Sequence, residues 1–264
     1  MFDRIETLFG TSATVAVGAD SRGALGSLEL AERAGGRFEM EAPIESPFDY
    51  EHNLRVVFVN DATDPSRLVD RTVSALATVA RQLGGRTMGL FTSRDRLAQA
   101  ADKLDEVLAP EGISIIAPST GNADPHDLVR TFMETEHAVL LGARAFWQGV
   151  DVPGDACQAV VIEKLPFDVP GDPLIQRRME LVDREGGHSF PDYMLPRMLL
   201  RLKQMVGRLI RTPSDRGIVV VVESRADKRY FRKLQDALPP NAPFVVGPLA
   251  DLEAHVGAFL PRNT

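Results

Sequence analysis

Short apolar runs alternate with longer segments of helical periodicity through most of the chain after residue 54. The apolar runs cover residues 55–59, 87–91, 113–116, 137–142, 158–163 and 217–224. Several of them are apolar at nearly every position, which is typical of strands buried on both faces of a parallel sheet. The pattern therefore predicts a set of core strands separated by crossover segments.

The segments between these runs carry helix signals. Residues 66–83 place apolar side chains at helical spacing and end at two glycines, and a further helix is expected between the run 87–91 and about residue 108. Asp124 and Pro125 are a typical cap and first residue of another helix. Strands separated by helices predict an α/β fold, doubly wound, with a mostly parallel sheet and helices on both faces. Ligands of such folds bind at the carboxyl ends of strands, so we look for chemistry in the loops that follow the strands.

Residues 191–211 predict one helix with two contrasting faces. The apolar face holds Leu195, Met198, Leu199, Leu202, Met205, Val206 and Leu209. A wedge of roughly 80° on the other side holds Arg197, Arg201, Gln204, Arg208 and Arg211. No acid of this helix offsets those charges. Gly207, beside the wedge, costs about 1 kcal/mol of helicity relative to alanine and lets a ligand or a second backbone come close. A solvated basic face and a phosphate-binding face both suit the pattern, and arginine is the residue suited to bidentate phosphate binding.

Residues 145–155, AFWQGVDVPGD, follow the run 137–142 and combine flexible and acidic positions. Gly149 permits a tight backbone near a ligand, and Asp151 can accept a hydrogen bond from a hydroxyl, an arginine or a ribose. A glycine-rich connection with an aspartate that caps a turn would have the same composition. Both interpretations remain open on spacing alone.

Thr92 and Ser93 follow another strand and open an expected helix. Their hydroxyls and amides, with Arg94 beside them, suit an anion site at a helix N-terminus. An ordinary Ser/Thr cap explains the same residues, and the pattern alone favours the cap.

Composition narrows the class of protein. The chain has 264 residues with 44% hydrophobic and 25% charged side chains, which is ordinary for a globular protein. A net charge of −7 argues against a surface that binds nucleic acid everywhere, yet residues 201–233 hold ten basic and three acidic side chains. One cysteine excludes a disulfide framework and favours a cytoplasmic protein. The five histidines lack metal-ligand spacing, so no metal site is expected. No apolar run reaches about 18 residues, so no membrane span is expected.

Taken in order, these segments resemble the later motifs of superfamily 2 helicases, most closely the DinG/XPD-like branch. The matches are TSAT at 11–14 with motif III, FTS at 91–93 with motif IV, FWQGVDVPG at 146–154 with motif V and QMVGRLIR at 204–211 with motif VI. SPFDY at 46–50 and KLPF at 164–167 also resemble that branch. The resemblance covers about residues 8–240, and its motif V and VI matches are specific.

The resemblance implies a motor of two RecA-like domains, with ATP and Mg²⁺ bound between them and single-stranded DNA lying across both. It also implies 5′ to 3′ movement and a role in DNA repair. It implies that residues 1–50 are a lead-in from the first motor domain and that residues 51–264 are the second domain. The implied roles are catalytic for Arg208, Arg211 and Gln204 at the γ-phosphate, nucleotide-binding for Gly149, Asp151 and Gly207, DNA-binding for Thr92, Ser93 and Arg94, and coupling for Thr11, Ser12, Ala13 and Thr14.

The sequence departs from the family in what precedes these motifs. It has no Gly-x-x-x-x-Gly-Lys-Ser/Thr phosphate loop and no predicted strand that ends in the paired acids needed for Mg²⁺. It has a single cysteine, where many relatives use four to hold a 4Fe–4S cluster. We therefore expect the Mg²⁺ ligands, and any such cluster, in a first motor domain supplied in cis or in trans, and we expect this chain alone not to hydrolyse ATP. Two alternatives remain. One is a stand-alone nucleic-acid-binding or regulatory module without ATPase activity, and the other is a flavodoxin-like small-molecule domain, which leaves the basic wedge unexplained.

Overall fold

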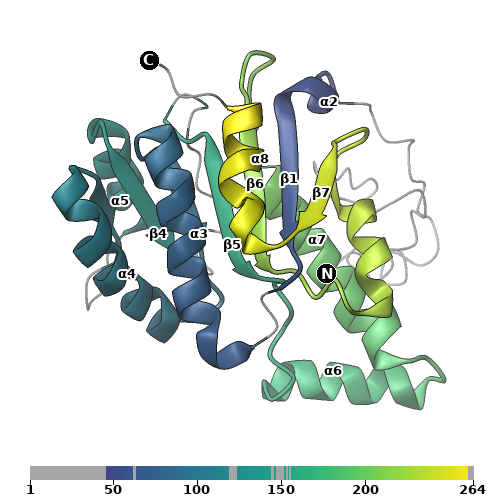
Figure 1. Cartoon of the computed structure of the whole chain (residues 1–264). Coiled ribbons are helices and arrows are strands. Elements are labelled where there is room, and N and C mark those ends of the chain that lie inside the picture. Colours follow the sequence, from purple (N-terminus) through teal and green to yellow (C-terminus); the bar gives the residue numbers. More distant parts are fainter. Residues whose placement is uncertain are drawn as a thin grey trace, which may run out of the picture.

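A parallel β-sheet with helices on both faces forms the body of the protein (Figure 1). The computed structural model describes residues 46–61, 64–118, 124–143, 146, 152, 154, 156–207 and 209–260. Within them the strand order is β3-β4-β2-β5-β6-β1-β7, and every neighbouring pair is parallel. The strands are β1 (Leu54–Val59), β2 (Thr87–Leu90), β3 (Ser114–Ile116), β4 (Ala138–Gly142), β5 (Ala159–Lys164), β6 (Gly217–Glu223) and β7 (Phe244–Gly247). The predicted doubly wound α/β fold is confirmed.

Helices connect most of these strands. The α-helices are α2 (Tyr50–Asn53), α3 (Leu68–Leu83), α4 (Arg94–Leu108), α5 (Pro125–Glu134), α6 (Pro173–Arg184), α7 (Leu195–Val206) and α8 (Leu252–Phe259). Short 3₁₀ helices cover Pro65–Arg67, Ala109–Glu111, Arg229–Ala237 and Leu249–Asp251, and a π-helical turn, Phe190–Met194, precedes α7. Among the described helices, none combines the length and apolar character that crossing a bilayer requires.

The sheet divides the hydrophobic core into two layers. Successive side chains of a strand point to opposite faces. Val56 and Phe58 of β1 pack in the layer that contains apolar residues of α5 and α7. Val57 and Val59 pack in the layer formed with α3, α4 and α8. Both faces of the central strands are therefore buried, which explains why their sequences are apolar throughout.

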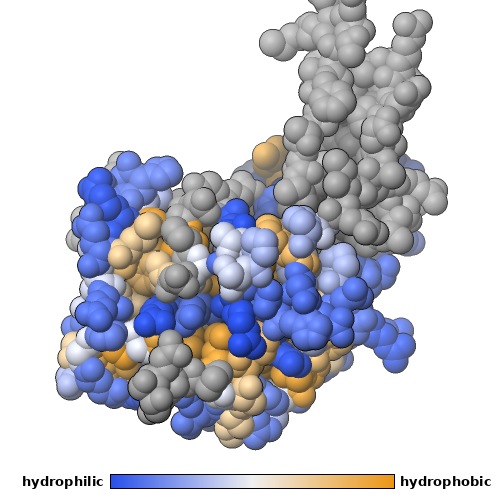
Figure 2. Space-filling model, turned by 90° about the horizontal axis from the view of Figure 1, so that it is seen from above, coloured by the Kyte–Doolittle hydropathy of each residue, from blue (hydrophilic) through white to orange (hydrophobic). Residues whose placement is uncertain are grey.

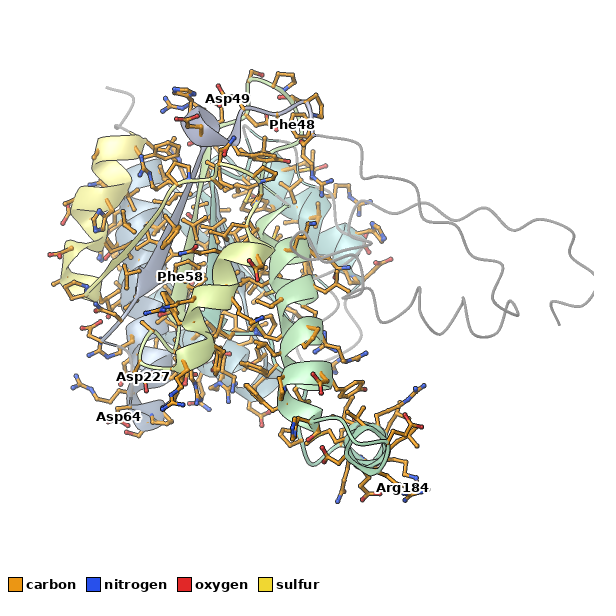
Figure 3. All side chains as sticks on the ribbon, turned by 90° about the vertical axis from the view of Figure 1, so that its right-hand side faces the viewer. Phe48, Asp49, Phe58, Asp64, Arg184 and Asp227 are labelled. Carbon is orange, nitrogen blue, oxygen red and sulfur yellow. The ribbon has the colours of Figure 1, made fainter. Side chains whose placement is uncertain are left out.

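All strands begin at one edge of the sheet, the amino edge, and end at the other, the carboxyl edge. Figure 3 marks both: Phe48 and Asp49, which precede β1, lie at one end of the molecule, and Asp64 and Asp227, which follow β1 and β6, lie at the other. Strands of three to seven residues separate the edges by about 10–23 Å at roughly 3.3 Å per residue. Helix α6, which carries Arg184, projects from the body beside the carboxyl edge.

Local signals in the sequence account for most helix boundaries. The Asp124 side chain accepts a hydrogen bond from the His126 amide at 3.0 Å with Pro125 at the first position, as predicted. Gly84 ends α3 with φ +62°, a conformation that favours glycine. The same Asp–Pro signal at Asp172 and Pro173 begins α6, a helix that the sequence analysis did not predict. It also did not predict β7 or α8.

Candidate functional site at the two edges of the sheet

The structure separates the predicted site residues into two groups. Thr92, Ser93 and Arg94 follow β2 at the carboxyl edge, whereas Gln204 and Arg211 lie at or beyond the C-terminal part of α7. Because β5 ends at the carboxyl edge and β6 begins at the amino edge, α7 runs back between them, and its C-terminal end lies near the amino edge. The motif VI-like segment, which the sequence analysis places on a helix, therefore lies at the edge opposite to the loop with Thr92, Ser93 and Arg94.

Several predicted residues fall outside the described part of the chain. These are Thr11, Ser12, Ala13 and Thr14 of the motif III-like segment, Gly149 and Asp151 of the motif V-like segment, and Arg208 of the motif VI-like segment. Their roles remain predictions. Three other residues of the motif V-like segment, Phe146, Val152 and Gly154, are described, and all three are buried.

The helix predicted for residues 191–211 is shorter than expected. A π-helical turn replaces its beginning, and α7 ends at Val206 with Gly207 as its C-cap. Gly207 therefore terminates the helix instead of weakening its middle, and Arg211 belongs to the turn before β6. Gln204 is half-buried on α7, while Arg211 and Gly207 are exposed. Leu209 and Ile210, which are 2% and 3% exposed, anchor that turn in the core.

One carboxylate organises the turn after α7. Asp215 Oδ2 accepts hydrogen bonds from the backbone amides of Arg211 at 2.7 Å and Thr212 at 2.8 Å, and Oδ1 accepts one from the Thr212 hydroxyl at 2.6 Å. Partial burial would raise the pKa of Asp215, but these hydrogen bonds outweigh it and hold the pKa below its ordinary value. Asp215 is therefore charged at neutral pH and fixes the backbone that carries Arg211.

The motif V-like and motif VI-like segments touch at this carboxylate. A Cβ atom built on Gly154 would lie 2.1 Å from Oδ1 of Asp215, so only glycine allows the two segments to approach this closely. Gly154 is three residues after Asp151 in the sequence, and Asp215 binds the amide of Arg211. The described residues thus join the two segments at the amino edge. Figure 2 looks down on this edge and shows hydrophilic residues across the middle of the face with apolar residues on both sides.

We expect Gly154→Ala to lower the free energy of unfolding by about 1–2 kcal/mol, because its methyl group displaces the Asp215 carboxylate from its donors. Urea unfolding followed by circular dichroism measures this cost. In an Asp215→Ala background the methyl group has room, so the same substitution should cost much less. Equal costs in the two backgrounds would show that this contact does not constrain the turn.

A buried acid on β5 binds the predicted DNA-binding loop at the carboxyl edge. Glu163, at the end of β5, is fully buried. Its Oε2 accepts hydrogen bonds from the amide of Thr92 at 3.0 Å and from its hydroxyl at 2.9 Å. Arg96 forms an ion pair with Glu163 and donates to the Thr92 hydroxyl at 2.8 Å. The amide and hydroxyl of Thr92 therefore already have a partner within the domain, whereas Arg94 is exposed.

Ser93 begins α4 as an ordinary cap. Its hydroxyl accepts a hydrogen bond from the Arg96 amide at 3.4 Å, which is the structural role that the sequence pattern favoured. The hydroxyl is half-buried rather than enclosed. The cap uses one lone pair of the Ser93 hydroxyl, and the hydroxyl proton can still be donated to a phosphate oxygen. The DNA-binding role of Ser93 therefore stays a prediction.

Two of the four arginines on the predicted basic face share one acid within the domain. Arg197 and Arg201 both bind Asp168, which lies in the loop after β5. The helix pattern could not reveal this acid, because Asp168 is 29 and 33 residues away in sequence. No acid of the helix itself lies among these arginines, as the sequence indicates, but an acid from the loop after β5 pairs with two of them.

Metal and thiol chemistry find little support in the part of the chain that the structure describes. Among these residues, no group of three or more histidine, cysteine or acidic side chains could hold a metal ion. Cys157 is buried, and burial raises the pKa of its thiol to about 12, so the thiol is not reactive at neutral pH.

A seven-strand, all-parallel sheet with helices on both faces is the architecture of a RecA-like domain. The model of the helicase C-terminal domain family matches residues 76–241, more than half of the chain. The protein belongs to the helicase C-terminal domain family, in its DinG/XPD-like branch.

Curated relatives and a solved structure agree with this assignment. The chain is 31% identical over 97% of its length to the 3′-5′ exonuclease DinG of Bacillus subtilis (strain 168), and 31% identical over 87% to the ATP-dependent DNA helicase YoaA of Escherichia coli (strain K12). It spans 28% and 35% of those relatives, about a third of their length. A solved XPD helicase structure superposes with a TM-score of 0.52 at 16% identity, covering 74% of this chain and 35% of that one, which supports the fold.

Proposed function

We propose that this chain is the second motor domain of an ATP-dependent DNA helicase of the DinG/XPD type that moves 5′ to 3′. Arg208 and Arg211 act as arginine fingers on the γ-phosphate, and Gln204 senses that phosphate. Gly149, Asp151 and Gly207 border the nucleotide. The partner is a first RecA-like motor domain, in cis or in trans, which supplies the phosphate loop and the Mg²⁺ ligands. Residues 51–264 form the domain, and residues 1–50 lead into it from the first. We infer a cytoplasmic protein that acts in DNA repair.

The observation that carries this proposal is the contact between Gly154 and Asp215, whose carboxylate also holds the amide of Arg211. An arginine finger needs a fixed backbone, because its guanidinium must meet a phosphate of another domain with little reorganisation. The hydrogen bonds from the Arg211 and Thr212 amides to the partly buried Asp215 carboxylate provide that rigidity. Arg211 is exposed, so it lies on the surface of this domain rather than in its core.

A separate DNA track at the carboxyl edge fits the distribution of charge. Ser93 and Arg94 lie there, and so does the segment 225–233 after β6, which holds five basic residues and one acid. DNA phosphates are bound chiefly by such cationic side chains and by amides at helix N-termini. In this arrangement Thr92 positions the loop through Glu163, and DNA phosphates contact Ser93 and Arg94. The crossover between β4 and β5, residues 143–158, then spans from the DNA edge to the nucleotide edge.

ATPase measurements on two forms of the protein test the proposal. The purified chain alone should hydrolyse ATP no faster than background. The chain joined to a first motor domain with a phosphate loop should show turnover that single-stranded DNA stimulates. Turnover by the chain alone would contradict the assignment of Mg²⁺ and the phosphate loop to a first domain. The joined protein binding DNA without turnover would favour the alternative, a nucleic-acid-binding or regulatory module without a motor.

A further inference from the structure

Asp168 ties the loop between β5 and α6 to the first turns of α7. It is 4% exposed, and its Oδ2 accepts a hydrogen bond from Nε of Arg197 at 2.7 Å while Oδ1 accepts one from Nη2 of Arg201 at 2.5 Å. Arg201 also donates through Nη1 to the Pro166 carbonyl at 3.2 Å. The two arginines are one helical turn apart, so this single acid constrains both the rotation and the axial position of α7.

The electrostatics make this clamp strong at neutral pH. Burial would raise the pKa of Asp168, but hydrogen bonds from Arg197 and Arg201 outweigh that effect and hold the pKa below its ordinary value. The carboxylate is therefore charged. The side chains of Arg197 and Arg201 are only 33% and 13% exposed. If the acid were removed, water could therefore replace few of the hydrogen bonds that these arginines make to it.

Helix α7 carries this constraint to the opposite edge of the sheet. Its 12 residues extend about 18 Å at about 1.5 Å per residue, and its apolar side is packed into the core along its whole length. A helix held in this way moves as a rigid unit. A rotation or shift at Arg197 would therefore be carried along α7 to Val206, where the chain enters the turn with Arg211.

Stability alone does not explain an arginine–aspartate–arginine cluster at this place. Well-packed apolar residues of similar volume often stabilise a fold as much as a buried ion pair does, since desolvation offsets the attraction. The cluster also fixes the orientation of α7 relative to the loop with Asp168, because planar guanidinium groups bind a carboxylate in a defined geometry.

We propose that Asp168 is a positioning residue for the catalytic arginines, holding α7 in the rotation that directs Arg208 and Arg211 toward the nucleotide. The proposal rests on the function proposed above. Misplacing a catalytic group by about 1 Å can cost about 100-fold in rate. Asp168 thus acts through α7, without contact to ATP or to DNA.

The first test is Asp168→Asn in the chain joined to a first motor domain. We expect the DNA-stimulated kcat to fall about 10- to 100-fold, while the KM for ATP and the Kd for a single-stranded oligonucleotide change less than about twofold. Circular dichroism at the assay temperature confirms that the protein is folded. Asp127→Asn is the matched control, because Asp127 pairs with exposed Arg130 on α5, and it should leave all three constants unchanged.

A second variant separates positioning from stability. Replacing the cluster by Asp168→Leu, Arg197→Met and Arg201→Met together should recover the stability lost in Asp168→Asn but not the kcat. Recovery of kcat together with stability would overturn the proposal, and so would wild-type kcat in folded Asp168→Asn. Absence of turnover in the unsubstituted joined protein would instead contradict the proposed function itself.

Discussion

Arg208→Ala should lower DNA-stimulated ATP hydrolysis by the joined protein by at least about 10³-fold. An arginine finger neutralises charge that develops on the transferred phosphoryl group and contributes about 10³–10⁵ in turnover. Alanine removes both the charge and the paired donors, and water in the cleft stabilises the transition state far less than a preorganised guanidinium does. The KM for ATP should change little, because the first domain holds most of the nucleotide. Single-turnover assays of phosphate release measure the effect.

Matched variants distinguish a finger from a general loss of positive charge. Arg208→Lys keeps the charge but loses the planar fork, so it should recover only a small part of the rate. Arg130→Ala removes an exposed arginine of α5 and should leave turnover unchanged. Arg211→Ala should resemble Arg208→Ala. Turnover within about tenfold of the unsubstituted protein in folded Arg208→Ala would rule out the finger.

Glu163→Ala should lower the free energy of unfolding by about 3–5 kcal/mol, the typical cost of leaving one member of a buried ion pair without its partner. Glu163 is fully buried and accepts hydrogen bonds from Arg96 and from the amide and hydroxyl of Thr92. Alanine leaves those donors without this acceptor and removes the charge that offsets Arg96, whose side chain is 28% exposed. Urea denaturation followed by circular dichroism and fluorescence gives the change in free energy.

Two controls define what this loss means. Glu180→Ala removes an acid of an exposed ion pair on α6 and should leave the stability within experimental error. Glu163→Gln keeps the shape of the side chain and one acceptor, so its cost should fall between those of the other two variants. A cost for Glu163→Ala as small as that of Glu180→Ala would mean that the network does not hold the loop after β2.

The core strands could be predicted because their signal is local and redundant. β1, β2, β4, β5 and β6 are apolar on both faces, and no other element of ordinary length needs such runs. β7 was not predicted although its sequence, FVVG, is apolar; it is a four-residue edge strand of which only Gly247 is buried. Helix α6 was missed although Asp172 and Pro173 repeat the signal found at Asp124. Only Ile175 among its residues is buried, so α6 contributes little to the core that the apolar runs mark out.

The boundaries of α7 show how tertiary structure overrides periodicity. The apolar spacing continues to Leu209, but the chain leaves the helix at Gly207 so that β6 can begin beside Gln158, whose carbonyl accepts the Ile218 amide at 3.0 Å. Leu209 remains buried in a non-helical turn. Periodicity records which side chains are buried, and it does not record the backbone conformation that buries them.

The amino-acid sequence by itself determined the α/β class, the strands of the core, the capped helices and the ordered motifs that match the helicase C-terminal domain family, because these depend on neighbouring residues. Only the tertiary structure decided which distant residues contact each acid. It pairs Asp168 with Arg197 and Arg201, encloses Glu163 beside Thr92 and Arg96, and sets Asp215 against Gly154. All five partners lie 29 to 71 residues from the acid along the chain. Such contacts arise where crossovers bring distant loops to one edge of the sheet, and no local pattern records that distance.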